Sequence, residues 1–495
     1  MKFLHAMQWK FNRNICIRGC LELAAIAVVY SVGCVLSNGN NLIAFLWMLA
    51  GCLGFFLYFS LSSRNLLDLR AILFASITGA VAVCQLRLSA IQVVWENETW
   101  LYQALGLAFF NIGYLLVNMT RLGQYAPAGE KREKQISKKI TFGFKPKHVY
   151  HCAIFLAVMP IVLFCIQAKI KGFIPIFVQR YDAYILFYTR LSIFINLVMF
   201  SAPLAFWCLK NLELKWWQRL IMYAIIPLPT IMFQLMVQRG LFVWSICILL
   251  VMVYFQNKHK FTSVLMVVAL MLFGIVFSSA MRGIPADAMK SIWQIDDNIV
   301  ISSPESSKPT DVTGPSDEVT QPGGADQNQQ NNAIIIKVPE FLYAPYYYVI
   351  NGMENFNHMV VNIEHHSMGL RQLTPFTVIL RFPALKNMIS QYPKFTILPS
   401  STNCLISDFY YDFGVLGIVV ESLLLGILSA IIQYFTQKKK DLFATLEYGV
   451  FLAVLLTAFF AAWFTEFGTW LFAGTAFLIF LYCYFSKRKE LNREG

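Results

Sequence analysis

The chain of 495 residues is 57% hydrophobic and only 14% charged, whereas soluble domains average roughly 25% charged residues. Such a composition excludes a disordered or collagen-like chain, a secreted disulfide scaffold and an ordinary cytosolic enzyme, and it predicts an all-α, polytopic integral membrane protein. The net charge of +13 would suit a nucleic-acid partner in a soluble protein. In so apolar a chain it indicates basic loops that face anionic lipid.

Twelve apolar runs approach or reach the roughly 20 residues that a helix needs to cross a bilayer. They lie near residues 19–37, 41–61, 69–89, 100–118, 149–168, 191–209, 220–237, 241–256, 261–280, 411–435, 446–464 and 469–485. The first nine form a predicted N-terminal membrane unit over residues 1–280, and the last three form a C-terminal membrane unit over 405–495.

The distribution of Lys and Arg predicts the orientation. Most of the 40 basic residues fall in short segments on one side, above all in the loop at 119–148. The positive-inside rule places these segments and both chain termini in the cytoplasm. The basic N-terminal segment lacks a small-residue cleavage site, so an uncleaved anchor is expected and not a removable signal peptide.

A long segment over 281–404 is then predicted on the outer side. Within it, residues 302–333 are rich in Ser, Pro, Asp, Gly and Gln, and they are expected to be disordered because they cannot bury enough apolar surface. Residues 336–400 are aromatic and partly apolar, which is typical of an amphipathic or re-entrant element at the outer interface.

The positive-inside bias disfavours arginine on the outer side, yet several arginines are predicted there or at the outer ends of spans. They are Arg180, Arg190, Arg239, Arg282, Arg371 and Arg381. The guanidinium fork suits phosphate oxygens, so the set predicts a site for a phosphate-bearing amphiphile. The alternative is that each arginine reaches a lipid headgroup or pairs with a nearby carboxylate, as Arg180 would with Asp182.

Acidic and histidine residues are the candidate bases. Asp408 and Asp412 bracket DFYYD at the outer mouth of the tenth span, four residues apart and therefore on one face of a helix. Partial desolvation by the aromatic neighbours would let one of them act as a general base. Acidic residues that favour a helix N-terminus would give the same pattern. His365 and His366 are further candidates, either as bases or as solvated loop residues.

Three tyrosines, Tyr347, Tyr410 and Tyr411, are candidates for stacking against sugar rings or for an aromatic belt at the lipid headgroups. Glu421 lies inside the tenth span, where an ionisable group is either functional or a partner in an interhelical hydrogen bond. The His and Cys spacing is not that of a metal site, and the usual cofactor motifs are absent. Neither a metal nor a cofactor is therefore expected.

Four segments resemble a known family. KGFIPIFVQRYDAYILFYTR (171–190) is similar to its first external loop, and VQRG (237–240) to an Arg-Gly hairpin two spans later. YYYVINGMENFNHMVVNIEHHSMGLRQLTP (346–375) resembles its large-loop helix region, and DFYYDFGVLGIVVESLLLG (408–426) the acidic and aromatic start of the next span. The family is that of the Wzy-type oligosaccharide repeat-unit polymerases, also called O-antigen polymerases. Residues 1–120 match it in hydropathy alone.

The resemblance implies a bacterial inner-membrane glycosyltransferase that works without a metal. Enzymes of this family transfer a glycan from a polyprenyl-pyrophosphate lipid on the outer leaflet to another lipid-linked repeat unit, and so build surface polysaccharide. The six arginines would stabilise the departing diphosphate, and Asp408, Asp412 or a histidine would deprotonate the attacking hydroxyl. The implied partners are the lipid-linked oligosaccharide, membrane lipid and a chain-length regulator protein, with no nucleic acid.

Two other functions remain open at this point. A ligase of the same superfamily would use the same arginines to join the glycan to a lipid core or to a protein. A flippase or another transporter of lipid-linked oligosaccharides would place charges along an intramembrane cavity, with short loops throughout. The distinctive residues of this chain lie instead on one predicted face.

Overall fold

The computed structural model describes most of the chain. The described residues are 13–89, 92–120, 146–178, 183–257, 262, 265, 298–301, 334–337, 343–380, 382–392, 402–439 and 441–494. The predicted disordered stretch 302–333 lies outside them, as does the predicted span 261–280 apart from two positions.

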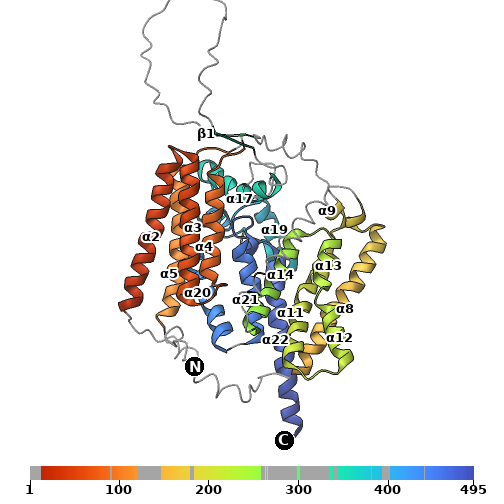
Figure 1. Cartoon of the computed structure of the whole chain (residues 1–495). Coiled ribbons are helices and arrows are strands. Elements are labelled where there is room, and N and C mark those ends of the chain that lie inside the picture. The colour runs from red at the N-terminus through yellow and green to blue at the C-terminus, as the bar shows by residue number, and fades with distance from the viewer. Residues whose placement is uncertain are drawn as a thin grey trace, which may run out of the picture.

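Four N-terminal helices pack together on one flank of the molecule (Figure 1). They are α2 (Arg13–Ser37), α3 (Asn41–Ser63), α4 (Leu69–Cys84) and α5 (Asn97–Asn118). In lipid a helix satisfies its own backbone hydrogen bonds, and polar side chains fix where two of these helices begin. Asn40 accepts a hydrogen bond of 3.1 Å from the Ile43 amide ahead of α3, and Asp68 accepts one of 2.9 Å from the Arg70 amide ahead of α4.

The middle of the chain forms the other flank (Figure 1). Its elements are α8 (Pro146–Lys171), η1 (Pro175–Phe177), α9 (Ala183–Phe187), α10 (Arg190–Ile195), η2 (Asn196–Phe200), α11 (Ser201–Asn211), α12 (Trp216–Ile225), α13 (Leu228–Leu235) and α14 (Arg239–Gln256). The predicted span 220–237 is therefore two short helices. The interruption falls at Pro227, where the missing backbone N–H and the ring disfavour a continuous helix.

The C-terminal helices connect the two flanks. They are α20 (Leu405–Lys439), α21 (Leu442–Leu456), the short η4 (Trp463–Thr465) and α22 (Phe467–Glu494). α20 packs along α5 of the first flank, and α21 contacts α4, α14, α20 and α22. The C-terminal unit is therefore built into both flanks.

The backbones of α5 and α20 touch each other directly. A Cβ atom added to Gly113 would overlap the Leu423 carbonyl, and one added to Gly426 would overlap the Phe110 carbonyl. Small residues permit such close approach between membrane helices. We call this pair of contacts the glycine seam.

One end of the bundle carries α17 (Tyr343–Asn362) and α19 (Pro383–Ser390), opposite the end at which α2 begins and α22 finishes (Figure 1). We call these the α17 end and the terminal end. α18 (Thr374–Leu380) contacts α19, η4 and α22. Two short strands, β1 (Asn298–Ile301) and β2 (Ile334–Lys337), pair antiparallel with Asn298 opposite Lys337. Apart from this ribbon the described elements are helical, which confirms the all-α prediction in its coarse form.

Among the described residues, eight helices are long and apolar enough to cross a membrane. They are Asn14–Ser37, Asn41–Ser63, Asn97–Asn118, Pro146–Lys171, Arg190–Asn211, Arg239–Gln256, Leu405–Gln437 and Phe467–Tyr484. α4 and α21, with 16 and 15 residues, are shorter than the runs predicted at 69–89 and 446–464. The membrane class is thus supported, whereas the count of twelve spans stays a prediction.

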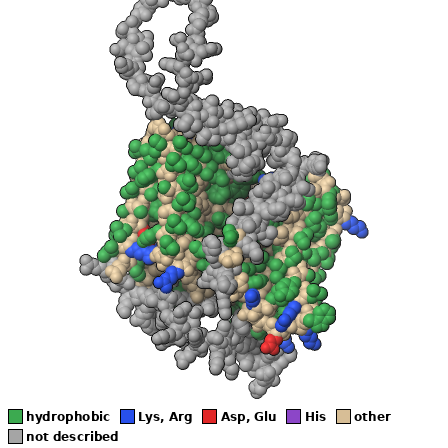
Figure 2. Space-filling model, in the orientation of Figure 1, with side chains coloured by type: hydrophobic (Ala, Val, Ile, Leu, Met, Phe, Trp, Pro, Cys, Tyr) green, Lys and Arg blue, Asp and Glu red, His purple; other side chains and the backbone are tan. Residues whose placement is uncertain are grey.

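The surface of these helices is largely hydrophobic (Figure 2). Val35 and Leu61, for example, are each 72% exposed. A continuous apolar surface of this kind is unfavourable in water, and a lipid bilayer is the solvent that suits it.

Four charged residues lie together at the terminal end of the first flank, and we call them the Arg70 cluster: Arg18, Glu22, Asp68 and Arg70. Three of them are buried, and Arg18 is partly exposed. Arg70 is 4% exposed, and its guanidinium nitrogens lie 3.8 Å from Glu22 Oε2 and 3.6 Å from Asp68 Oδ1. Arg18 Nε donates to Glu22 Oε1 at 2.8 Å. Two positive and two negative charges therefore balance within the cluster.

Candidate functional site

α20 is broken near its start, directly after the predicted Asp408–Asp412 pair. Phe413 (φ −136°, ψ 21°) and Gly414 (φ 61°, ψ −143°) leave the helical conformation. The positive φ of Gly414 is one that residues with a Cβ rarely adopt. Asp408 and Asp412 thus belong to a short first segment, 405–412, which turns into the long second segment of the helix.

A loop over residues 363–373 docks on this break through the Asp412 carboxylate. The Ser367 hydroxyl donates to Asp412 Oδ1, and the backbone amides of Arg371 and Gln372 donate to Oδ1 and Oδ2, each at 3.1 Å. The Ser367 amide also donates to the Tyr411 carbonyl at 2.9 Å. Asp412 is 0% exposed, and both of its oxygens accept bonds from the loop. Its evident action is to hold the loop on the helix.

His366 lies directly on the break. A Cβ on Gly414 would stand 2.9 Å from His366 Nε2, so glycine is also the residue that leaves room for the imidazole. The ring meets Tyr410 edge-on, with centroids 5.3 Å apart. His366 is half-buried, and its Nδ1 atom is buried without a hydrogen-bond partner among the described residues. His365, one position earlier, is exposed.

Arg371 and Glu421 add opposite charges beside the break. The Arg371 charge interacts with Asp412 and with Tyr411, while its Nε is buried and makes no hydrogen bond within the described part of the chain. Glu421, from the second segment of α20, accepts a 2.9 Å bond from Gln372 Nε2 on Oε2, and its Oε1 is likewise without a partner there. Glu421 also interacts electrostatically with Asp412. An unsatisfied buried polar atom is costly and calls for an explanation.

Asp408 is directed to a different loop. It is 1% exposed, and its Oδ2 accepts a 2.8 Å bond from the Thr465 hydroxyl of η4. The sequence places the two aspartates on one helix face, yet they hold two separate segments. Asp412 holds loop 363–373, which precedes α20 in the chain, and Asp408 holds η4, which follows α20.

Arg239 reaches the α17 end from the other flank. It begins α14 two residues after Val237, which has a φ of +55° that a β-branched residue seldom adopts. The Arg239 guanidinium lies 5.5 Å from the Tyr348 ring of α17. Tyr347, which is 6% exposed, packs against the same Tyr348 ring with centroids 5.7 Å apart.

The structure gathers part of the predicted set. Asp412, His366, Arg371, Tyr410 and Tyr411 lie around the α20 break. Asp408 accepts a hydrogen bond from η4, and Arg239 lies over the Tyr348 ring of α17. Tyr347 is itself part of α17. Arg190 is exposed at the start of α10 on the second flank. Arg180, Arg282 and Arg381 lie outside the described residues.

Glu354 of α17 is a buried carboxylate that is not among the predicted site residues. It is 1% exposed and accepts 3.1 Å bonds from Gln92 Nε2 and from Trp95 Nε1. Burial raises the pKa of Glu354 to about 7, and the two hydrogen bonds and the Arg87 charge only partly oppose the rise. The polar residues at helical spacing in NGMENFNH are the sequence signal that could have identified this face of α17 as buried.

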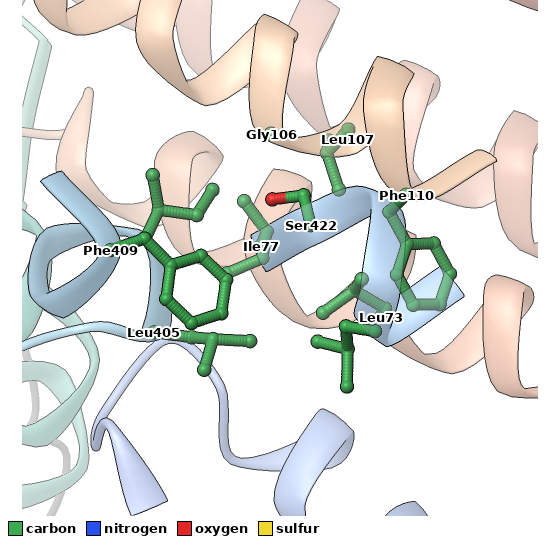
Figure 3. Close-up of a pocket in the computed structure, with 10 residues that line it drawn as sticks. Leu73, Ile77, Gly106, Leu107, Phe110, Leu405, Phe409 and Ser422 are labelled. Carbon is green, nitrogen blue, oxygen red and sulfur yellow. The ribbon is translucent and has the colours of Figure 1, made fainter. Parts of the chain in front are cut away.

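An apolar pocket between α4, α5 and α20 lies close to the first segment of α20 (Figure 3). Its lining is Leu73, Ile77, Gly106, Leu107, Phe110, Leu405, Ile406, Phe409, Ser422 and Leu425. The pocket measures only about 10 Å³, which is roughly the least space that holds one water molecule. It is a gap in the packing and not a substrate site. In the described part of the chain, no three His, Cys, Asp or Glu residues come together as a group that could hold a metal ion.

Comparison of the chain with protein-family models, with curated proteins and with solved structures finds no match. Function is therefore inferred from the residues around the α20 break.

Proposed function

We propose that this chain is a metal-independent bacterial glycosyltransferase of the Wzy type, which joins polyprenyl-pyrophosphate-linked oligosaccharide repeat units into surface polysaccharide. The observation that carries the proposal is the docking of loop 363–373 on the α20 break. It gathers an imidazole, a guanidinium and carboxylates at one end of an apolar helix bundle. A hydroxyl nucleophile needs a base, and a diphosphate leaving group needs cations.

The proposed reaction is a direct glycosyl transfer. A hydroxyl oxygen of one repeat unit attacks the anomeric carbon of another, and a glycosidic C–O bond forms. The C–O bond to the pyrophosphate breaks, and its electron pair leaves with the polyprenyl pyrophosphate. The hydroxyl proton passes to His366, whose Nδ1 has no partner in the described part of the chain.

The remaining residues divide into binding and positioning roles. Arg371 is assigned to the leaving diphosphate because its Nε is unpartnered beside the break, and Arg239 is assigned to it from the α14 side of the same end. Asp412 and Asp408 are assigned positioning roles, because their carboxylates hold loop 363–373 and η4. Tyr410 and Tyr411 are assigned to the sugar.

The proposed topology has twelve spans in the inner membrane, with both termini in the cytoplasm and the α17 end at the outer leaflet. Most Lys and Arg side chains visible in Figure 2 lie toward the terminal end, which supports a cytoplasmic face there. A chain-length regulator protein is the further partner that the proposal implies.

The test is a gene deletion in the host, complemented with single-residue variants and read out as polysaccharide length on gels. We expect the deletion strain to accumulate single lipid-linked repeat units, and we expect wild type but not Arg371→Ala or Arg239→Ala to restore the ladder. Glu364→Gln, an exposed carboxylate of the same loop, is the matched control and should restore it. Long lipid-linked chains that stay unattached in the deletion strain would point to a ligase, and a normal ladder from both arginine variants would refute the phosphate site.

A further inference from the structure

Tyr410 meets a residue of α5, a helix that has no assigned part in the proposed reaction. The Tyr102 ring of α5 stacks on the Tyr410 ring, with centroids 5.3 Å apart and an interplanar angle of 30°. Since His366 touches the same Tyr410 ring at 5.3 Å, Tyr102 stands one ring away from the assigned base.

Glu98 belongs to the same face of α5, because residues four apart on a helix are neighbours. Its side chain is exposed, and its carboxylate interacts electrostatically with the Tyr410 phenol. Neither the Glu98 carboxylate nor the Tyr102 and Tyr410 hydroxyls make a hydrogen bond to another residue in the described part of the structure. The Glu98 carboxylate and the hydroxyls of the two stacked tyrosines thus keep their hydrogen-bonding capacity unused.

Helix packing does not require this arrangement. The glycine seam already holds α5 against α20 through backbone contact at Gly113 and Gly426. Gly106, about two helical turns closer to the site than Gly113, lies against Ile406 and Ile418. An exposed acidic residue beside a ring pair adds nothing to that contact. It does match a sugar, since aromatic rings pack on the C–H face of a pyranose and a carboxylate accepts strong hydrogen bonds from its hydroxyls.

We infer that Glu98, Tyr102 and Tyr410 form a sugar subsite for the acceptor, with Glu98 accepting hydrogen bonds from ring hydroxyls next to the one that attacks. The inference rests on the proposed function and deepens it. It gives α5, from residues 1–120, which resemble the polymerases in hydropathy alone, a part in substrate binding.

The test separates sugar binding from diphosphate binding by means of the oligosaccharide alone. The lipid-linked material that accumulates in the deletion strain is treated with mild acid, and the freed oligosaccharide is titrated against full-length protein in nanodiscs. Glu98→Gln and Tyr102→Leu should each weaken binding about tenfold, and inorganic pyrophosphate should not compete. Glu96→Gln removes an exposed carboxylate two residues earlier, which lies on another face of the helix, and should bind like wild type.

Turnover provides the second readout. The KM for the lipid-linked repeat unit should rise in Glu98→Gln and Tyr102→Leu with kcat unchanged. The reason is that the lost contact stabilises the bound substrate and the transition state equally. Tyr102→Phe, which retains the ring, should lie between wild type and Tyr102→Leu, and equal size-exclusion profiles would establish that all variants fold. Wild type that makes polymer but binds the freed oligosaccharide no better than Glu98→Gln overturns the subsite alone. Folded wild type that makes no polymer overturns the proposed function.

Discussion

The Arg70 cluster and the α20 break both place charges inside a largely apolar protein, at opposite ends of the bundle. In the Arg70 cluster the charges balance, and the Arg70 guanidinium is enclosed by two carboxylates and by the rings of Phe59 and Tyr114 at 4.6 and 4.2 Å. Beside the break, neither Arg371 nor Glu421 forms an ion pair with another described residue, and the ion pairs of the described structure lie in the Arg70 cluster. Both regions contain buried polar atoms without a hydrogen-bond partner among the described residues, on Arg18 and Arg70 in the cluster and on His366, Arg371 and Glu421 at the break. The two regions therefore differ in ion pairing and not in the presence of unsatisfied atoms.

The difference shows how to separate structural from functional charges in a membrane bundle. Burial alone does not do so, because Arg70 is more buried than Arg371. The distinguishing property is whether neighbouring groups neutralise the charge. The comparison predicts that variants of the Arg70 cluster change stability and that variants at the break change activity.

The largest effect is expected from Arg70→Met. The substitution leaves Glu22 and Asp68 buried without their shared cation, and removal of one partner from a buried ion pair costs about 3–5 kcal/mol. Unfolding of the purified protein in detergent should show this loss. The polymer formed per folded molecule should stay unchanged, and an Arg70→Met protein as stable as wild type would remove the basis of the comparison.

His366→Asn should act in the opposite way. Loss of a general base lowers the rate by roughly 10²–10⁴-fold, while the melting temperature should stay near that of wild type because His366 is half-buried and its Nδ1 makes no bond there. The measurement is polymer formed per unit time by protein in nanodiscs. His365→Asn, at the exposed neighbouring position, should lose far less, and equal losses in the two variants would contradict the assignment of the base to His366.

Glu354 is intermediate between the Arg70 cluster and the α20 break. Its carboxylate is buried, and its hydrogen-bond donors, Gln92 and Trp95, are neutral. The unfolded chain releases this proton near pH 4.5, whereas the folded protein retains it until about pH 7. Folding is therefore favoured by this group at low pH, and stability falls as the pH rises from about 4.5 to above 7, by about 3 kcal/mol in all. Glu354→Gln should flatten this part of the pH–stability curve, and an unchanged slope in the variant would show that another group titrates.

The smallest effect is expected from Arg18→Gln. Arg18 pairs with Glu22 at 2.8 Å, but its side chain is 36% exposed, and pairs that solvent reaches contribute at most about 1 kcal/mol. The loss should therefore be well below that of Arg70→Met in the same unfolding experiment. A loss as large as that of Arg70→Met would mean that the whole cluster acts as one unit.

Hydropathy and helix chemistry predict much of the fold. The long apolar runs become helices, and Asn40 and Asp68 cap them as such residues do. The errors have local causes. The span at 220–237 is interrupted at Pro227, and the runs at 69–89 and 446–464 include residues beyond Cys84 and Leu456, where the helices stop. Hydropathy averages over such interruptions and does not detect them.

The candidate site is only partly predictable. DFYYDFG does identify the start of α20, and its glycine is the residue at which the helix breaks. That Asp412 would hold loop 363–373 depends on backbone amides of Arg371 and Gln372, which carry no sequence signal. Glu421 joins the site because the break and the loop bring Gln372 to it. Tertiary contacts of this kind follow from the packing and not from the composition.

The glycine seam constrains the order in which the protein can be assembled. α5 is synthesised long before α20, so the shallow surface at Gly113 must face lipid or a neighbouring helix until its partner enters the bilayer. Because Gly426 leaves equally little room, the second helix has to arrive in a single register. The late step that inserts α20, which only η4, α21 and α22 follow in the described chain, is then also the step that brings Tyr102 and Tyr410 together, so that the proposed acceptor surface forms late in biogenesis.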